Sequence, residues 1–144
     1  MNNYLKLNNL SKKYEGNKSL KVLNNINFKF ESGKVYSIVG PSGSGKSTLL
    51  NLLSLIDIPS SGFIEYNNKK IDTNSTIEND SIRSKNIGII YQDKNLLADF
   101  TALENVFLPN LLVTKDKKKS IDLAKKLIKQ FGLNLRFNHF PSEL

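Results

Sequence analysis

The nine residues that begin at Gly40 read GPSGSGKST, and this stretch constrains the fold more than any other part of the chain. Its glycines permit backbone angles that turn successive N–H groups toward one concave site, which suits an anion. A helix that starts directly afterwards would add its N-terminal N–H groups to the same site. The stretch fits the pattern G-x-x-x-x-G-K-[ST], with Gly40, Gly45, Lys46 and Ser47 at its fixed positions.

The segments on either side of this stretch favour a phosphate-binding loop, or P-loop. Residues 35–39 (VYSIV) are apolar or small throughout, which is typical of a strand covered on both faces. Residues 48–55 (TLLNLLSL) are rich in leucine and predict a buried helix. A strand, the loop and a helix in this order predict an α/β fold with a nucleotide site. A plain glycine-serine turn is the alternative.

The loop residues have separate expected roles. Lys46 supplies a mobile ammonium group for the β- and γ-phosphates, and Ser47 supplies an oxygen ligand for Mg²⁺. By itself, such a loop leaves GTPases, nucleotide kinases and several kinds of ATPase open. Further residues expected to contact the nucleotide are Gly40, Ser42, Gly43, Ser44, Gly45 and Thr48.

Several other segments have strand patterns. Residues 4–7 (YLKL) and 26–30 (INFKF) alternate apolar and polar side chains, as half-buried strands do. Residues 63–66 predict a third such strand, with a turn at 67–68. Residues 87–91 (IGIIY) predict a second strand buried on both faces, whereas the polar residues 72–81 predict a loop.

Beyond Tyr91 the patterns are helical. Thr101 and Glu104 are spaced as a capping box, so a helix should begin there. Pro109 and Asn110 are expected to break it. A last helix should run from about Lys117 or Ser120 to Phe131, with Gly132 as its C-terminal cap. Its apolar stripe consists of Ile121, Ala124, Leu127, Ile128 and Phe131.

Composition excludes some classes of site and leaves the partner open. The chain has no cysteine and a single histidine, His139, so thiolate and histidine-rich metal sites are excluded. It has neither a signal-peptide pattern nor an apolar run of about 20 residues, so we expect a soluble, cytoplasmic chain. The net charge of +8 comes mostly from scattered lysines, with one dense run at 115–119, and favours a solvated basic surface.

A series of motifs surrounds the P-loop, and together they resemble one family. They are residues 10–14 (LSKKY), 22–28 (VLNNINF), 31–34 (ESGK), 57–62 (DIPSSG), 87–92 (IGIIYQ) and 96–106 (LLADFTALENV). Their order resembles the ATPases of ABC transporters, and the last motif resembles the subgroup with lipoprotein-release and macrolide-export ATPases. The resemblance covers essentially the whole chain.

This resemblance implies how one ATPase domain would be organised. Residues 1–144 would be the N-terminal part of a P-loop ATPase domain of the ABC type. An antiparallel β-subdomain would take residues 1–35 and 62–72, and the P-loop strand and helix would take 36–56. Residues 87–92 would form the Q-loop strand, and 93–144 a partial helical subdomain.

The resemblance also assigns roles outside the P-loop. Tyr14 matches the aromatic residue that stacks on adenine, with Val22 lining the same pocket; packing beneath the β-subdomain is the alternative for Tyr14. Gln92 matches the Q-loop glutamine, which reaches Mg²⁺ or the attacking water and couples the γ-phosphate to a movement. An ordinary polar residue at a strand end is the alternative for Gln92. ATP and Mg²⁺ are therefore the implied cofactors.

Two other motif assignments fit less well. Residues 87–93 would be a metal-binding Walker B strand if Asp93 directly ended the apolar run, but Gln92 intervenes. Residues 68–72 (NKKID) resemble the base-reading N-K-x-D of GTPases, but the aspartate comes one residue too late. His139 is expected to be a surface or packing residue rather than a catalyst.

The implied partners are a membrane permease and a second ATPase subunit. Most apolar residues of the helical third are expected to be core, and a minority would form a docking patch for the permease; they are Leu96, Leu97, Phe100, Leu103, Phe107, Leu108 and Leu111. The chain would lie on the inner face of the membrane. Nucleic acid is not expected, although the basic charge prompts a non-transport ABC ATPase acting on nucleic acid as a weaker interpretation.

The chain ends at residues 140–144 (FPSEL), directly before the position of the family's S-G-G-Q signature. The resemblance implies that the signature, the Walker B carboxylates and a switch histidine would come later. These 144 residues are therefore expected to bind ATP without hydrolysing it efficiently, and to be marginally stable. The alternative is a non-catalytic nucleotide-binding remnant.

Overall fold

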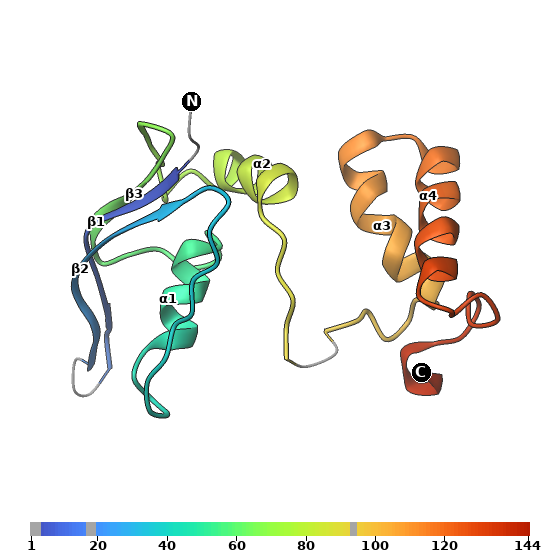
Figure 1. Ribbon diagram of the computed structural model, residues 1–144, viewed down its shortest axis with the longest axis horizontal. Helices are drawn as coiled ribbons and strands as arrows, with labels where there is room; N and C mark the ends of the chain where they lie inside the picture. Colours follow the sequence, from blue (N-terminus) through green and yellow to red (C-terminus); the bar gives the residue numbers. More distant parts are fainter. Residues whose placement is uncertain (1–3, 17–19, 93–94) are drawn as a thin grey trace. The chain divides into compact units, whose positions relative to one another are not determined.

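The computed structural model describes residues 4–16, 20–92 and 95–144, which fall into two compact units (Figure 1). The N-terminal unit is Met1–Ile87 and the C-terminal unit is Gly88–Leu144. The N-terminal unit contains the sheet and the P-loop, whereas the C-terminal unit is helical.

The sheet of the N-terminal unit is antiparallel and four-stranded. In spatial order it contains β2 (Leu20–Glu31), β1 (Tyr4–Tyr14), β3 (Ser61–Tyr66) and β4 (Lys69–Lys70). The predicted strands at 4–7, 26–30 and 63–66 and the turn at 67–68 are confirmed, although β1 and β2 are longer than their alternating patterns.

Irregular pairing between β1 and β2 explains the extra length. Their register shifts three times between Leu7 and Lys13. As a result three consecutive residues of β1, Leu10, Ser11 and Lys12, are all buried. A regular strand would turn alternate residues to opposite faces. Lys12 shares the face of Leu10, and the bulged pairing accounts for the burial of Ser11 between them.

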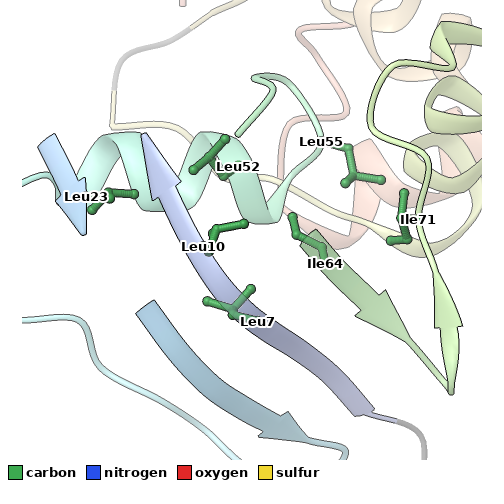
Figure 2. Packing of buried hydrophobic residues seen from close by; sticks show 7 residues of the cluster. All are labelled: Leu7, Leu10, Leu23, Leu52, Leu55, Ile64 and Ile71. Atoms are coloured by element: carbon green, nitrogen blue, oxygen red, sulfur yellow. The ribbon is translucent and has the colours of Figure 1, made fainter. Parts of the chain in front are cut away.

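The core of the N-terminal unit lies between the sheet and α1 (Lys46–Leu53) (Figure 2). Each fully buried leucine or isoleucine contributes about 1.5–3 kcal/mol through removal of apolar surface from water. The helix that follows the P-loop is thereby fixed against the sheet. The buried residues of this cluster are Leu7, Leu10, Leu23, Leu52, Leu55, Ile64 and Ile71.

The two strands predicted to be buried on both faces are not formed. Residues 34–40 and 87–91 have no regular secondary structure, and Val35 and Val39 are 97% and 86% exposed. A parallel strand needs hydrogen-bonding neighbours, and no described segment pairs with either stretch. Tyr36 instead packs its ring edge-on against Phe28 and Phe30 of β2.

The polar stretch predicted as a loop contains a helix. α2 spans Thr76–Asn86, and its N-cap Ser75 accepts a hydrogen bond from the Glu78 N–H at 3.4 Å. Ser75 and Glu78 form the S-x-x-E pattern that marks a helix start. The loop prediction was wrong from Thr76 onward, because a capped helix start can form in a polar stretch.

The C-terminal unit packs α3 (Ala102–Thr114) against α4 (Lys117–Gln130) and ends in a short 3₁₀ turn, Pro141–Glu143. The predicted capping box is confirmed: Thr101 Oγ1 accepts from the Glu104 N–H, and the Glu104 carboxylate accepts from the Thr101 N–H at 2.8 Å. None of the described helices is long and apolar enough to cross a lipid bilayer.

Pro109 lies inside α3 and does not break it, contrary to the prediction. An interior proline costs a helix about 3 kcal/mol, so other contacts must offset it. The buried Phe107 provides one such contact, and Ser120 of α4 donates a hydrogen bond to the Asn110 side chain at 2.9 Å. Tertiary packing therefore decides the length of this helix.

The end of α4 follows the prediction. Gly132 has a φ of +73°, its N–H bonds to the Lys129 carbonyl at 3.0 Å, and the Leu133 N–H bonds to the Ile128 carbonyl at 3.1 Å. This pair of bonds is a Schellman motif. Of the predicted stripe, Ala124 and Ile128 are buried, whereas Phe131 is exposed.

Candidate nucleotide site

The P-loop glycines have the backbone angles that the sequence predicts. Gly43 and Gly45 have φ values of +77° and +90°, in the left-handed region, and Gly40 has +155°. Gly45 is also the N-cap of α1. A Cβ atom on Gly40 would lie 2.8 Å from Ser44 Oγ, so the Ser44 hydroxyl would have to rotate away to admit a side chain there.

The start of α1 is available to an anion. The first N–H to make a helical bond is that of Leu49, which donates to the Gly45 carbonyl at 2.8 Å. The N–H groups of Lys46, Ser47 and Thr48 precede it and have no helical partner. The first turn contains no acidic residue, so no carboxylate neutralises the positive end of the helix dipole.

The Lys46 side chain turns back over the loop. Its ammonium group donates hydrogen bonds to the carbonyls of Gly40 and Pro41, both at 2.8 Å. These carbonyls lie at the start of the loop, so the positive charge is held at the loop itself. An ammonium group has three hydrogens, and one remains for a phosphate oxygen even before these bonds rearrange.

Ser47 fits the role predicted for a Mg²⁺ ligand. Its side chain is exposed on the first turn of α1 and makes no hydrogen bond to another described residue. Across the described ranges, no cluster of three or more acidic or histidine side chains could hold a metal by itself. Mg²⁺ keeps waters and takes phosphate oxygens alongside few protein ligands, and one exposed hydroxyl is compatible with that coordination.

Val22 lies directly against the P-loop. A Cβ atom placed on Gly45 would be 3.0 Å from Val22 Cγ1 and 3.2 Å from the Val22 carbonyl oxygen. The β2 strand therefore contacts the loop at the residue that the sequence predicted to line the nucleotide pocket. The remaining predicted loop residues, Ser42, Gly43 and Ser44, are exposed on the same stretch.

Tyr14 is the last residue of β1 and pairs with Leu20 of β2. Leu20 lies two positions before Val22 in the same strand. Tyr14 is 42% exposed. Its hydroxyl donates a hydrogen bond to Asp57 Oδ2 at 3.0 Å. The ring thus stands at the surface of the sheet end that contacts the P-loop through Val22.

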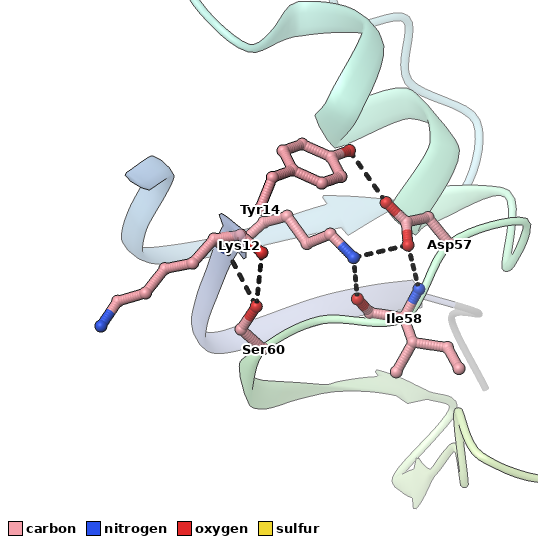
Figure 3. Close-up of polar contacts among 6 residues, drawn as sticks. Lys12, Tyr14, Asp57, Ile58 and Ser60 are labelled. Carbon is pink, nitrogen blue, oxygen red and sulfur yellow. Dashed lines mark hydrogen bonds and ion pairs between the residues drawn. The ribbon is translucent and has the colours of Figure 1, made fainter. Parts of the chain in front are cut away.

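Lys12 and Asp57 hold this region together, although sequence reasoning gave neither a role (Figure 3). Lys12 Nζ lies 2.6 Å from Asp57 Oδ1 and donates a second bond, of 2.7 Å, to the Ile58 carbonyl. The same ammonium group lies 5.0 Å from the centroid of the Tyr14 ring. A lysine and an aspartate 45 positions apart give no local sequence signal, because only the fold brings them together.

The Asp57 carboxylate is stabilised in its charged form. Partial burial raises its pKa, but the bonds from Lys12 Nζ, the Ile58 N–H and the Tyr14 hydroxyl lower it, and the net pKa lies below the ordinary aspartate value. Asp57 is therefore ionised at neutral pH and remains an acceptor for both side chains.

Gln92 belongs to the C-terminal unit, where it is exposed and outside any helix or strand. Asp93 lies outside the described residues. His139 acts through its backbone: its carbonyl accepts a hydrogen bond from the Ala102 N–H at 2.8 Å, at the start of α3. Within the N-terminal unit, the structure brings the P-loop together with Val22, and Tyr14 stands at the same sheet end.

Comparison with known proteins identifies the family. The family model described as ABC transporter matches residues 23–143. The lipoprotein-releasing system ATP-binding protein LolD of Wigglesworthia glossinidia brevipalpis is 46% identical over 147 residues, covering 100% of this chain and 64% of that protein. LolD of Rickettsia bellii (strain RML369-C) is 40% identical over 144 residues, covering 99% of this chain and 63% of that protein.

Solved structures give the same result. The ATP-binding cassette MJ0796, in a dimeric post-hydrolysis state bound to ADP and Pi, has a TM-score of 0.87 and 35% sequence identity. The match covers 97% of this chain and 62% of that one. The chain thus spans somewhat less than two thirds of the length of these relatives. The resemblance to lipoprotein-release ATPases is confirmed, and the chain belongs to the ABC transporter ATP-binding family.

Proposed function

We propose that this chain is the nucleotide-binding part of an ABC transporter subunit that couples ATP binding and hydrolysis to substrate movement by a membrane permease. The observation that carries the proposal is the geometry of the P-loop. Its glycines have positive φ angles, the Lys46 ammonium group is held over the loop, and the first turn of α1 contains no carboxylate. The names of the LolD relatives favour lipoprotein release as the process.

Each part of the site has a proposed task. The N–H groups at the start of α1 and in the glycine loop bind the phosphates, and Lys46 stabilises the charge of the β- and γ-phosphates. Ser47 would hold Mg²⁺, which supplies charge neutralisation to the phosphate oxygens when it is bound. Tyr14 stacks on adenine, with Val22 beside it. Gln92 would reach the metal or the attacking water.

These 144 residues should bind ATP but should not hydrolyse it efficiently. They contain neither an S-G-G-Q sequence nor an aspartate followed by a glutamate. Phosphoryl transfer depends on positioned groups that support Mg²⁺ and orient water, so their absence lowers turnover by orders of magnitude. We propose that the permease and a second ATPase subunit complete the working assembly at the inner face of the membrane.

Titration calorimetry with Mg²⁺-ATP tests the proposal. The chain should bind Mg²⁺-ATP, and Lys46→Ala should weaken that binding by at least tenfold, because the P-loop ammonium is lost. Lys34→Ala is the matched control, since Lys34 is an exposed lysine of the same unit that pairs with Glu31. The proposal fails if the wild-type chain binds no nucleotide, or if both variants bind as it does.

A further inference from the structure

The segment that follows α1 is fastened to β1 by hydrogen bonds from consecutive residues. Lys12 Nζ bonds to the Asp57 carboxylate and the Ile58 carbonyl, at 2.6 and 2.7 Å. One residue further along β1, the Lys13 N–H donates to Ser60 Oγ at 2.9 Å. The C-terminal end of the P-loop helix is therefore tied to the end of the strand that presents Tyr14.

These contacts also fix the orientation of the Tyr14 ring. At its edge, the hydroxyl donates to Asp57 Oδ2 at 3.0 Å. Over one of its faces, Lys12 Nζ lies 5.0 Å from the ring centroid, within the range of a cation–π contact. Because Asp57 binds both the hydroxyl and the ammonium group, one carboxylate determines both contacts. Tyr14 as a whole is still 42% exposed, so surface remains for a flat ligand.

The side chains of the Lys12–Asp57 pair are largely shielded from solvent. Lys12 is 9% exposed, and the side chains of Lys12 and Asp57 are 11% and 26% exposed. A paired charge at this depth is screened less by salt than the exposed pairs of the same unit, such as Lys69 with Glu78. An aromatic ring held in one orientation before the ligand arrives loses less conformational entropy on binding.

We propose that Asp57 is a positioning residue for nucleotide recognition: through Lys12 and the Tyr14 hydroxyl it holds the Tyr14 ring ready to stack on the base. This inference rests on the proposed function, because it takes Tyr14 as the base-stacking residue. Asp57 would then influence the affinity for the base although it belongs neither to the P-loop nor to the residues proposed to contact the nucleotide. Asp57 acts on base binding only, since the phosphates are held by the P-loop.

The test compares two ligands that differ in the base. Mg²⁺-ATP uses the ring and the P-loop, whereas inorganic tripolyphosphate with Mg²⁺ uses only the P-loop. Asp57→Asn should weaken binding of Mg²⁺-ATP about threefold to tenfold, since part of the base–aromatic stacking is lost. Its affinity for tripolyphosphate should not fall. Tyr14→Ala, which removes the ring, should lower the affinity for Mg²⁺-ATP at least as much as Asp57→Asn does.

Two further variants separate positioning from general effects. Asp80→Asn makes the same change in charge on the exposed partner of Arg83 in the same unit, and it should leave both affinities within about twofold of wild type. Tyr14→Phe keeps the ring and the Lys12–Asp57 pair but removes the hydroxyl. It should lower the affinity for Mg²⁺-ATP and not that for tripolyphosphate. Tyr14→Phe replaces Asp57→Asn as the test if Asp57→Asn does not fold because Lys12 loses its partner.

The outcomes distinguish this inference from the proposed function. If the wild-type chain binds neither ligand, the proposed function fails. If it binds both but folded Asp57→Asn retains wild-type affinity for Mg²⁺-ATP, or weakens both ligands equally, the positioning role is refuted and the proposed function stands. If Asp57→Asn does not fold and Tyr14→Phe binds Mg²⁺-ATP as wild type does, the positioning role is also refuted.

Discussion

Replacing Gly45 by alanine tests whether the P-loop and β2 are as closely packed as the structure shows. Gly45 has a φ of +90°, and its added Cβ would lie 3.0 Å from Val22 Cγ1 and Leu23 Cδ2 and 3.2 Å from the Val22 carbonyl oxygen. Side-chain methyl groups can rotate away, but the carbonyl is fixed by the strand. The substitution therefore combines backbone strain with overpacking.

The expected magnitude follows from these two effects. A side chain in the left-handed region costs about 1–2 kcal/mol, and overpacking a close contact costs about 1–3 kcal/mol. We expect Gly45→Ala to lower the free energy of unfolding by about 2–5 kcal/mol. Gly33→Ala is the matched control, since Gly33 has a φ of +76° but nothing within 4 Å of its added Cβ. It should lose only the strain, about 1–2 kcal/mol.

Urea denaturation of the two variants and the wild-type chain measures this difference. Gly45→Ala should be the less stable variant by about 1–3 kcal/mol, because only its Cβ meets β2. Mg²⁺-ATP affinity should fall with Gly45→Ala and not with Gly33→Ala, since only Gly45 belongs to the loop. Equal losses of stability in the two variants would refute the close contact between the loop and Val22.

Three further predictions concern the core, the second unit and the effect of pH. Leu52→Ala should lower the free energy of unfolding by about 2–5 kcal/mol, whereas Leu50→Ala, on the exposed side of the same helix, should cost less than about 1 kcal/mol; similar losses would contradict the packing of α1. Thr101→Ala should destabilise the C-terminal unit by about 0.5–2 kcal/mol in urea, because it removes the capping box, and no measurable loss would argue against that cap. The pKa of Asp57 is lowered on folding, so its ion pair with Lys12 stabilises the fold fully above the unfolded pKa of about 4 and is lost as pH falls through the folded pKa. The stability difference between wild type and Asp57→Asn should narrow as pH falls from about 5 to about 3, and a constant difference would exclude this linkage.

Features encoded within a few residues were predicted well from the sequence. The P-loop, the Thr101 capping box and the Gly132 cap each depend on residue types at fixed, short spacing. Their chemistry is local: a glycine adopts positive φ, and a side chain caps a nearby N–H. The structure reproduces all three. The same local rules would have found α2, because Ser75 and Glu78 carry its start signal.

Features that depend on distant partners were predicted poorly. The apolar stretch at 35–39 has the composition of a central strand, but a strand exists only when neighbours accept its hydrogen bonds, and no described segment does so. Pro109 is the opposite case, because a helix continues where the sequence predicted a break. Its local cost predicts a break, but packing of α3 on α4 sustains the helix. In both cases the tertiary environment outweighs the local pattern.

The candidate site combines both kinds of information, which explains why the P-loop and Tyr14 were assigned from the sequence but Lys12 and Asp57 were not. Phosphate recognition needs consecutive N–H groups, so a short loop can encode it alone. Base recognition needs an oriented ring, and here Tyr14 is oriented by Lys12 from its own strand and by Asp57 from the segment after α1. Lys12 lies two positions after the buried Leu10 and is buried with it, so its place is set by how β1 pairs within the sheet and not by a short local pattern.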